Sequence, residues 1–250
     1  MLALKLFLVP FFLGLISLAG KRWGPGLAGW LAGLPVIVGP ILFLLALERG
    51  APFARDAAVY TLGAVFPVIV FGVGYAWASR RHAWPLALLA GYGAWLLAAL
   101  LLLSLPLDLT LAAGVALTTL LAAPWLFPKP VGKPGIANLP HHELGLRMLA
   151  GAVLTLAVTS LAAVAGPGLS GLLTLFPVLS AILAAFTHRA GGADAVITLL
   201  AALARGLGSL AGFCLALPLL LERTSMAVAF GLSVAIALLI QTALWKRNLR

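Results

Sequence analysis

A fragment of thirteen residues occurs twice in this chain and limits its possible folds more than any other feature. Residues 24–36 read GPGLAGWLAGLPV, and residues 166–178 read GPGLSGLLTLFPV, with eight positions identical. Both copies lie in almost entirely apolar sequence. Duplicated membrane segments broken by glycine and proline are typical of two-repeat transporters and channels. The alternative is a chance recurrence of Gly/Pro patterns in apolar helices, and the matching register of Pro35 and Pro177 argues against it.

The composition places the chain in lipid. Of its 250 residues, 63% are hydrophobic and only 9% are charged, whereas a soluble domain has about 25% charged residues. The net charge of +10 is not a nucleic-acid signal, because the basic residues fall between apolar runs and form no basic helix interleaved with aromatics. Membrane topology explains these charges better.

The hydrophobic runs predict an all-α integral membrane protein. A helix needs about 20 apolar residues to cross a bilayer, and helices satisfy the backbone groups that lipid cannot. The sequence contains nine hydrophobic runs of about this length, at about 2–20, 25–47, 56–79, 84–105, 109–127, 147–165, 168–187, 193–221 and 225–245. The first run could instead be a signal peptide, and a single helix over 84–127 would reduce the number of spans to eight.

The lysines and arginines predict the orientation. With nine spans, one side carries four of them, Lys5, Arg49, Arg55 and Arg223. The other side carries eleven, which are Lys21, Arg22, Arg80, Arg81, Lys129, Lys133, Arg147, Arg189, Lys246, Arg247 and Arg250. Because the richer side is normally cytoplasmic, we expect a multi-pass protein of a bacterial inner membrane with its N-terminus outside and its C-terminus inside. Eight spans would scramble this asymmetry.

The two copies of the fragment predict an inverted repeat. They open the second and seventh runs, so five spans separate equivalent points and the copies cross the membrane in opposite directions. We therefore expect a first four-helix unit over 1–105 and a second, inverted one over 147–250. Residues 106–146 supply a connecting helix and a proline-rich cytoplasmic linker. Such repeats place a site near the membrane midplane between the units.

The first unit resembles the GlpM-like family of small four-helix bacterial membrane proteins. The resemblance covers residues 1–105 and depends on a set of spaced motifs, Ala28-Gly29, Pro35, Glu48-Arg49-Gly50 and Arg55. The second unit keeps Gly171 and Pro177 but has His188 in place of the glutamate. The chain also looks like larger uncharacterised bacterial proteins with two fused units. The resemblance implies a four-helix repeat and brings no activity, substrate or catalytic residue.

Arg205 is the first candidate for a substrate-binding residue, together with its neighbour Gly206. It stands about twelve residues into a long apolar run. An arginine at the centre of a lipid-facing helix costs about 2.5–3.5 kcal/mol or more, so it should face the bundle or water. The functional interpretation is an anion-binding or gating charge. The alternatives are a structural pair with a carboxylate or helix carbonyls, and an arginine that snorkels to the surface.

Broken helices supply the rest of the candidate substrate site. Pro35, Gly39 and Pro40 interrupt the second run, and Pro177 interrupts the seventh. Proline removes a backbone donor and frees carbonyls, so the end of a half-helix could face a substrate. The alternative is an ordinary kink. Gly29 and Gly33, spaced as small-xxx-small, predict close helix packing.

Charged residues near the helix ends are candidate gates. Glu48, Arg49 and Asp56, beside Arg55, cluster at the outer end of the second and third runs. His188, Arg189 and Asp194 form the expected counterpart inside, with Glu48-Arg49 aligned to His188-Arg189 and Asp56 to Asp194 after small loop deletions. The alternative for all six is that they are solvated helix ends and interface anchors.

The linker sequence His141-His142-Glu143 suggests a metal, but adjacent side chains rarely converge on one ion. We expect a solvated loop, with Glu143 able to pair with Arg147 one turn later. No catalytic or nucleotide-binding motif is present in the sequence. We therefore expect no enzyme activity, no cofactor and no metal.

The sequence favours a secondary transporter or exporter of a small solute that is anionic or amphipathic. Its expected partners are the lipid bilayer and this unknown solute, with no nucleic acid, and a homo-oligomer stays open. Two alternatives remain, a membrane scaffold that transports nothing and a lipid-handling protein such as a flippase or an enzyme subunit.

Overall fold

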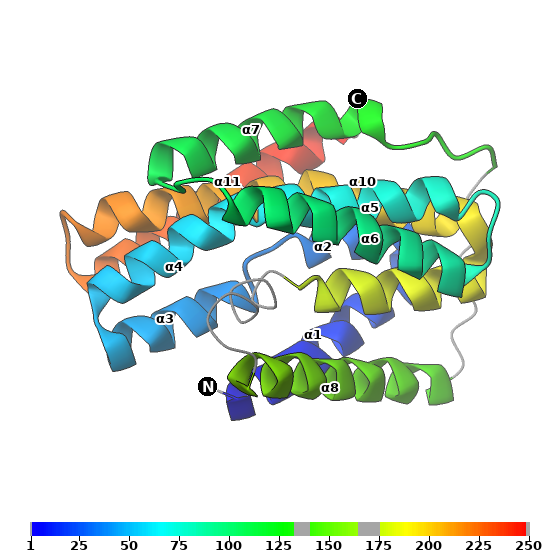
Figure 1. The fold of residues 1–250 in the computed structure, drawn as a ribbon, viewed down its shortest axis with the longest axis horizontal. Coiled ribbons are helices and arrows are strands. Elements are labelled where there is room, and N and C mark those ends of the chain that lie inside the picture. The colour runs from blue at the N-terminus through cyan, green and yellow to red at the C-terminus, as the bar shows by residue number, and fades with distance from the viewer. Residues whose placement is uncertain (1, 133–140, 165–175, 249–250) are drawn as a thin grey trace.

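A computed structural model describes residues 2–132, 141–164 and 176–248, and these residues form helices without any strand. The helix axes are roughly aligned with one another, and the chain runs back and forth along them (Figure 1). In chain order they are α1 Leu2–Trp23, α2 Pro25–Ala32, α3 Val38–Arg49, α4 Ala51–Gly63, α5 Val65–Ala78, α6 Trp84–Leu103, α7 Leu109–Leu126, α8 His141–Val164, α10 Val178–Leu221 and α11 Met226–Asn248.

The helices are those of a polytopic membrane protein. Seven segments of the described residues are long and apolar enough to cross a bilayer: Leu6–Trp23, Ala51–Ala78, Trp84–Leu103, Leu109–Leu126, Glu143–Leu161, Val178–Leu221 and Met226–Leu244. Large apolar side chains point outward from them, for example Leu97, Trp125 and Leu239, which are 72%, 82% and 68% exposed. An apolar surface of this extent suits lipid rather than water.

The predicted nine spans do not all correspond to long helices. The run 25–47 is divided into α2 and α3, of 8 and 12 residues, each shorter than a bilayer requires. The runs 168–187 and 193–221 contribute to one 44-residue element, α10, and 165–175 lie outside the described residues. The count of nine stays a prediction.

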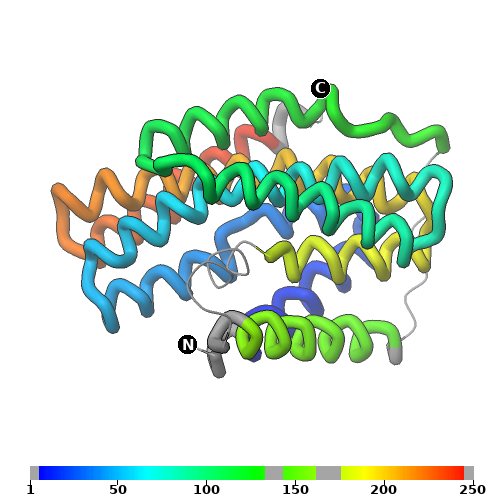
Figure 2. Tube along the Cα trace, in the orientation of Figure 1, coloured from blue at the N-terminus to red at the C-terminus, as the bar shows by residue number. Residues whose placement is uncertain are grey.

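Helix α10 consists of two arms that meet at Gly192. This residue has φ 74° and ψ −170°, which no helix accommodates. Figure 2 shows the yellow part of the tube turning back on itself here. Gly50 has a similar conformation, φ 89° and ψ 164°, between α3 and α4. Positive φ is readily available only to glycine, so the two glycines set these turns.

Gly50 and Gly192 lie 142 residues apart, and other features share this spacing. The duplicated fragments begin at residues 24 and 166, and α6 and α11 begin at residues 84 and 226. Fully buried Phe71 and Phe213 are a further pair at the same interval. At this spacing His188 corresponds to Ala46. The expected alignment of Glu48-Arg49 with His188-Arg189 through loop deletions is therefore displaced by two residues from the one that the helix boundaries give.

Candidate functional site

The second hydrophobic run is interrupted as predicted. Helix α2 ends at Ala32, a turn occupies 33–37, and α3 begins at Val38. Within the turn the N–H of Gly33 donates to the Trp30 carbonyl at 3.3 Å, and the N–H of Gly39 donates to the Pro35 carbonyl at 2.7 Å. Pro35 lies in the turn, where its missing donor costs least. Gly39 and Pro40 lie in the first turn of α3 instead.

The end of α2 is held by a side chain from the other end of the sequence. Nε2 of Gln241, on α11, donates to the Trp30 carbonyl at 2.9 Å. Gln241 is only 2% exposed, and its Oε1 has no hydrogen-bond partner in the described part of the chain. A carbonyl released by a helix break needs a partner in lipid. Gln241 supplies one, and sequence analysis did not single this residue out.

Glycines bring α2 against the second arm of α10. A Cβ added to Gly29 would overlap the Leu199 carbonyl, and one added to Gly33 would overlap the Gly206 backbone. A Cβ on Gly206 would in turn overlap the Trp30 carbonyl. Because these neighbours are backbone atoms, they cannot move aside as a side chain would. The close packing predicted for Gly29 and Gly33 is confirmed, with Gly206 as its counterpart.

Arg205 does not point into this interface. Its side chain is exposed, and its Nε donates to the Ala201 carbonyl one turn earlier at 3.3 Å. The arginine thus contacts a carbonyl of its own helix, which was one of the alternatives to a substrate-binding role. Its neighbour Gly206 meets the interrupted segment.

Pro177 lies immediately before α10 and forms its N-cap. Phe176 beside it stacks on Tyr92 of α6 at 4.9 Å between ring centroids and meets Trp95 edge-on at 5.1 Å. These contacts attach the start of α10 to α6. The rest of the second fragment, including Gly171, lies outside the described residues.

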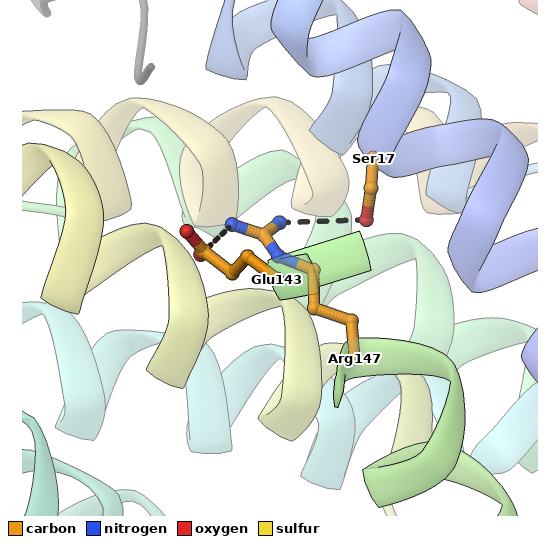
Figure 3. A network of polar contacts seen from close by, with 3 residues as sticks. All are labelled: Ser17, Glu143 and Arg147. Carbon is orange, nitrogen blue, oxygen red and sulfur yellow. Dashed lines mark hydrogen bonds and ion pairs between the residues drawn. The ribbon is translucent and has the colours of Figure 1, made fainter. Parts of the chain in front are cut away.

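The buried charge of the described chain is Arg147, on α8. Its side chain is 3% exposed, and its Nη2 donates to Oε1 of Glu143 at 2.9 Å. Its Nη1 donates to the Ser17 hydroxyl of α1 at 3.4 Å (Figure 3). The guanidinium carbon lies 5.3 Å from the ring centroid of Phe186 on α10. The predicted Glu143–Arg147 pairing is confirmed, but the solvated loop expected at His141-His142-Glu143 is wrong, because α8 begins at His141. The burial of the pair between three helices was not foreseen.

The expected outer gate is an exposed set of ion pairs. Nε of Arg55 lies 2.8 Å from Oε1 of Glu222, just past α10, while Asp56 is 4.0 Å from Arg55. Glu48 is exposed, and the Arg49 guanidinium lies 5.8 Å from the Phe53 ring centroid. Pairs this exposed contribute about 0–1 kcal/mol each. Glu222, absent from the predicted cluster, is the main partner of Arg55.

The expected inner gate is dispersed over several contacts. Nδ1 of His188 lies 3.3 Å from the hydroxyl of fully buried Tyr75 on α5. The Asp194 carboxylate accepts hydrogen bonds from the backbone N–H of Val131 at 3.0 Å and of Gly132 at 2.8 Å. Arg189 is exposed. These residues attach α10 to α5 and to the segment after α7 rather than to one another.

The described residues contain no group of three or more metal-ligating side chains. The His141 and His142 side chains lie outside that part of the chain. Comparison of the chain with protein-family models, curated proteins and solved structures gave no match. The helices define the class of this protein, a polytopic helical membrane protein with an interrupted second segment. Support for a function comes from its own geometry.

Proposed function

We propose that the chain is a secondary transporter or exporter of a small anionic or amphipathic solute, built from two inverted four-helix units. The first unit comprises residues 1–105 and the second 147–250, with 106–146 between them. The proposal includes nine membrane crossings in a bacterial inner membrane and an N-terminus outside. It also keeps the GlpM-like relationship of the first unit. It includes no enzyme activity, and it is compatible with either a monomer or a homo-oligomer.

The constant interval of 142 residues supports the two units, because it links the turns at Gly50 and Gly192 and the starts of α6 and α11. Figure 1 shows α1 and α8 running in opposite directions, as α5 and the long second arm of α10 also do. Opposite directions at equivalent positions are what an inverted repeat requires. The total is nine crossings if α2 and α3 together make one crossing and the two arms of α10 belong to two separate crossings.

One observation carries the transport proposal, the interruption between α2 and α3. A continuous helix is the cheaper way to cross lipid, since it satisfies every backbone group internally. Here the break is instead supported by dedicated contacts, Gln241 on the Trp30 carbonyl and Gly206 against Gly33. Discontinuous helices at a repeat interface are the usual location of transporter binding sites.

The experiment is uptake into proteoliposomes containing the purified chain, with panels of labelled carboxylates, phosphate esters and amphipathic solutes. Wild type should accumulate at least one of them above empty vesicles. Arg205→Ala tests the predicted role of that arginine, with exposed Arg223→Ala as the matched control. Equal uptake by Arg205→Ala and Arg223→Ala removes Arg205 from the site.

Two further results would overturn the proposal itself. One is the absence of flux for every solute together with a protein partner that copurifies, which favours a scaffold. The other comes from accessibility labelling of the termini. Termini on the same face of the bilayer contradict an odd number of crossings and with it the inverted arrangement.

A further inference from the structure

Arg147 is the buried charged side chain among the described residues, at 3% exposure. It lies where α1, α8 and α10 meet, with Ser17, Glu143 and Phe186 around its guanidinium. A charge at such a position is costly unless it is paired and hydrogen-bonded. Ionisable side chains within membrane segments usually serve function for this reason.

The contacts of Arg147 with the described residues leave much of its bonding capacity unused. A guanidinium carries five N–H donors in a planar fork that fits two oxygens of a carboxylate or phosphate. Glu143 engages only through Oε1, and the Ser17 contact is long at 3.4 Å. The Arg147 Nε has no hydrogen-bond partner in the described part of the chain. The resident pair is therefore weaker than the bidentate pair this arginine could form.

Glu143 is the partner that can leave. Its side chain is 15% exposed, compared with 3% for Arg147, and it lies one turn closer to the start of α8. Figure 3 shows the guanidinium between the Glu143 carboxylate and the Ser17 hydroxyl. An incoming anion that displaces Glu143 keeps the buried arginine neutralised throughout, so the exchange avoids the cost of an isolated buried charge.

The position of Arg147 in the second unit has a basic counterpart in the first. Lys5 stands 142 residues earlier, near the start of α1 as Arg147 stands near the start of α8. Since α1 and α8 run in opposite directions (Figure 1), the two positions lie toward opposite ends of the bundle. The repeat interval thus places equivalent positions of the two units toward opposite ends of the bundle.

We infer that Arg147 binds the carboxylate or phosphate group of the transported solute, between α1, α8 and α10, in exchange for Glu143. This inference rests on the transport function proposed above and names the chemical class of its solute. Arg147 supplies the fork, Ser17 a hydroxyl beside it, and Phe186 an aromatic face against the guanidinium.

The test is thermal unfolding of the purified full-length chain in neutral detergent, titrated with acetate or inorganic phosphate at constant ionic strength in a chloride background. Wild type should be stabilised by one or both anions. Glu143→Gln should bind the same anion about tenfold more tightly, because the competing carboxylate is gone. Arg81→Gln, which removes an exposed arginine, is the matched control and should respond as wild type does.

Arg147→Lys keeps the charge but loses the fork, so its anion response should weaken at least about tenfold. The exchange Glu143→Arg with Arg147→Glu preserves a neutral pair and should fold without an anion response. An equal response in wild type, Glu143→Gln and Arg147→Lys overturns the inference. So does stabilisation by phosphatidylglycerol alone, which would make the site one for lipid headgroups.

The binding and flux experiments distinguish a failure of the Arg147 site from a failure of the transport proposal. An anion response that depends on Arg147, without flux for any solute, upholds the site and rejects transport. Flux of a carboxylate or phosphate ester that is unchanged in Arg147→Lys upholds transport and rejects this site.

Discussion

Arg147 and Arg205 both belong to membrane-spanning helices of the second half of the chain, and their environments are opposite. Arg147 follows polar residues near the start of α8, yet it is 3% exposed and contacts α1 and α10. Arg205 stands in the middle of apolar α10, yet its side chain is exposed and bonded to a carbonyl of its own helix. Distance from the nearest polar segment thus says little about burial, because burial depends on which helix face a neighbour covers.

The largest expected change in stability comes from removing the partner of the buried arginine, Arg147. Glu143→Gln leaves the buried Arg147 charge without its carboxylate and should lower the free energy of unfolding by about 3–5 kcal/mol. The double variant Glu143→Gln with Arg147→Met removes both charges and should recover most of that loss. Unfolding by heat or denaturant in detergent measures both. Strictly additive effects would show that the two residues do not interact.

The Arg205 region should be sensitive through its backbone rather than its charge. Gly206→Ala places a methyl group into the Trp30 carbonyl, and overpacking of this kind costs about 1–3 kcal/mol. Gly231→Ala is the control, since a Cβ there meets nothing within 4 Å. Chemical denaturation of the two alanine variants should differ accordingly. Similar stabilities would mean that α2 does not lie against α10 as closely as the structure has it.

A smaller loss is expected at the support of the interrupted helix. Gln241→Leu removes the shorter of two hydrogen bonds to the Trp30 carbonyl and leaves the one from the Gly33 N–H, so it should cost about 1 kcal/mol. Thr242→Val is the neighbouring control, because the exposed Thr242 hydroxyl bonds only within its own helix, to Leu239. Hydrogen exchange of the segment 29–39 should increase in Gln241→Leu. Unchanged exchange would assign the support of the break to other contacts.

The smallest effect should come from Arg205→Ala. The side chain of Arg205 is exposed, and substitution of an exposed residue usually changes the free energy of unfolding by no more than about 0.5 kcal/mol. Thermal unfolding of Arg205→Ala and Glu143→Gln under the same conditions provides the comparison. A loss at Arg205 as large as that of Glu143→Gln would reverse the contrast between the two regions.

Local patterns predicted the local features of this protein well. The i,i+4 spacing predicted the pair of Glu143 with Arg147, and Pro35 predicted the interruption after α2. The small-xxx-small spacing of Gly29 and Gly33 predicted close packing. Each depends on residues within about one turn of one another, so no knowledge of the remaining fold was needed.

Features that join distant segments could not be predicted in the same way. The hydrophobic runs 168–187 and 193–221 placed a boundary where the chain turns at Gly192, but they carried no sign of which helices each arm packs against. Gln241 and Trp30 are 211 positions apart, and a single glutamine in an apolar helix carries no sign of its partner. Glu222 reaches Arg55 across a comparable distance along the chain.

By itself the sequence determined the solvent and the helical class of this protein, because apolar composition and run length decide what lipid accepts. It also indicated one interruption, at Pro35, since proline lacks a donor, although Pro10, Pro124 and Pro218 lie inside helices. Only the tertiary structure decided that Arg147 is enclosed while Arg205 is not, and that α11 supports the end of α2. Those outcomes depend on how helix faces from distant parts of the chain pack together, and packing is a property of the whole assembly of helices rather than of any one of them.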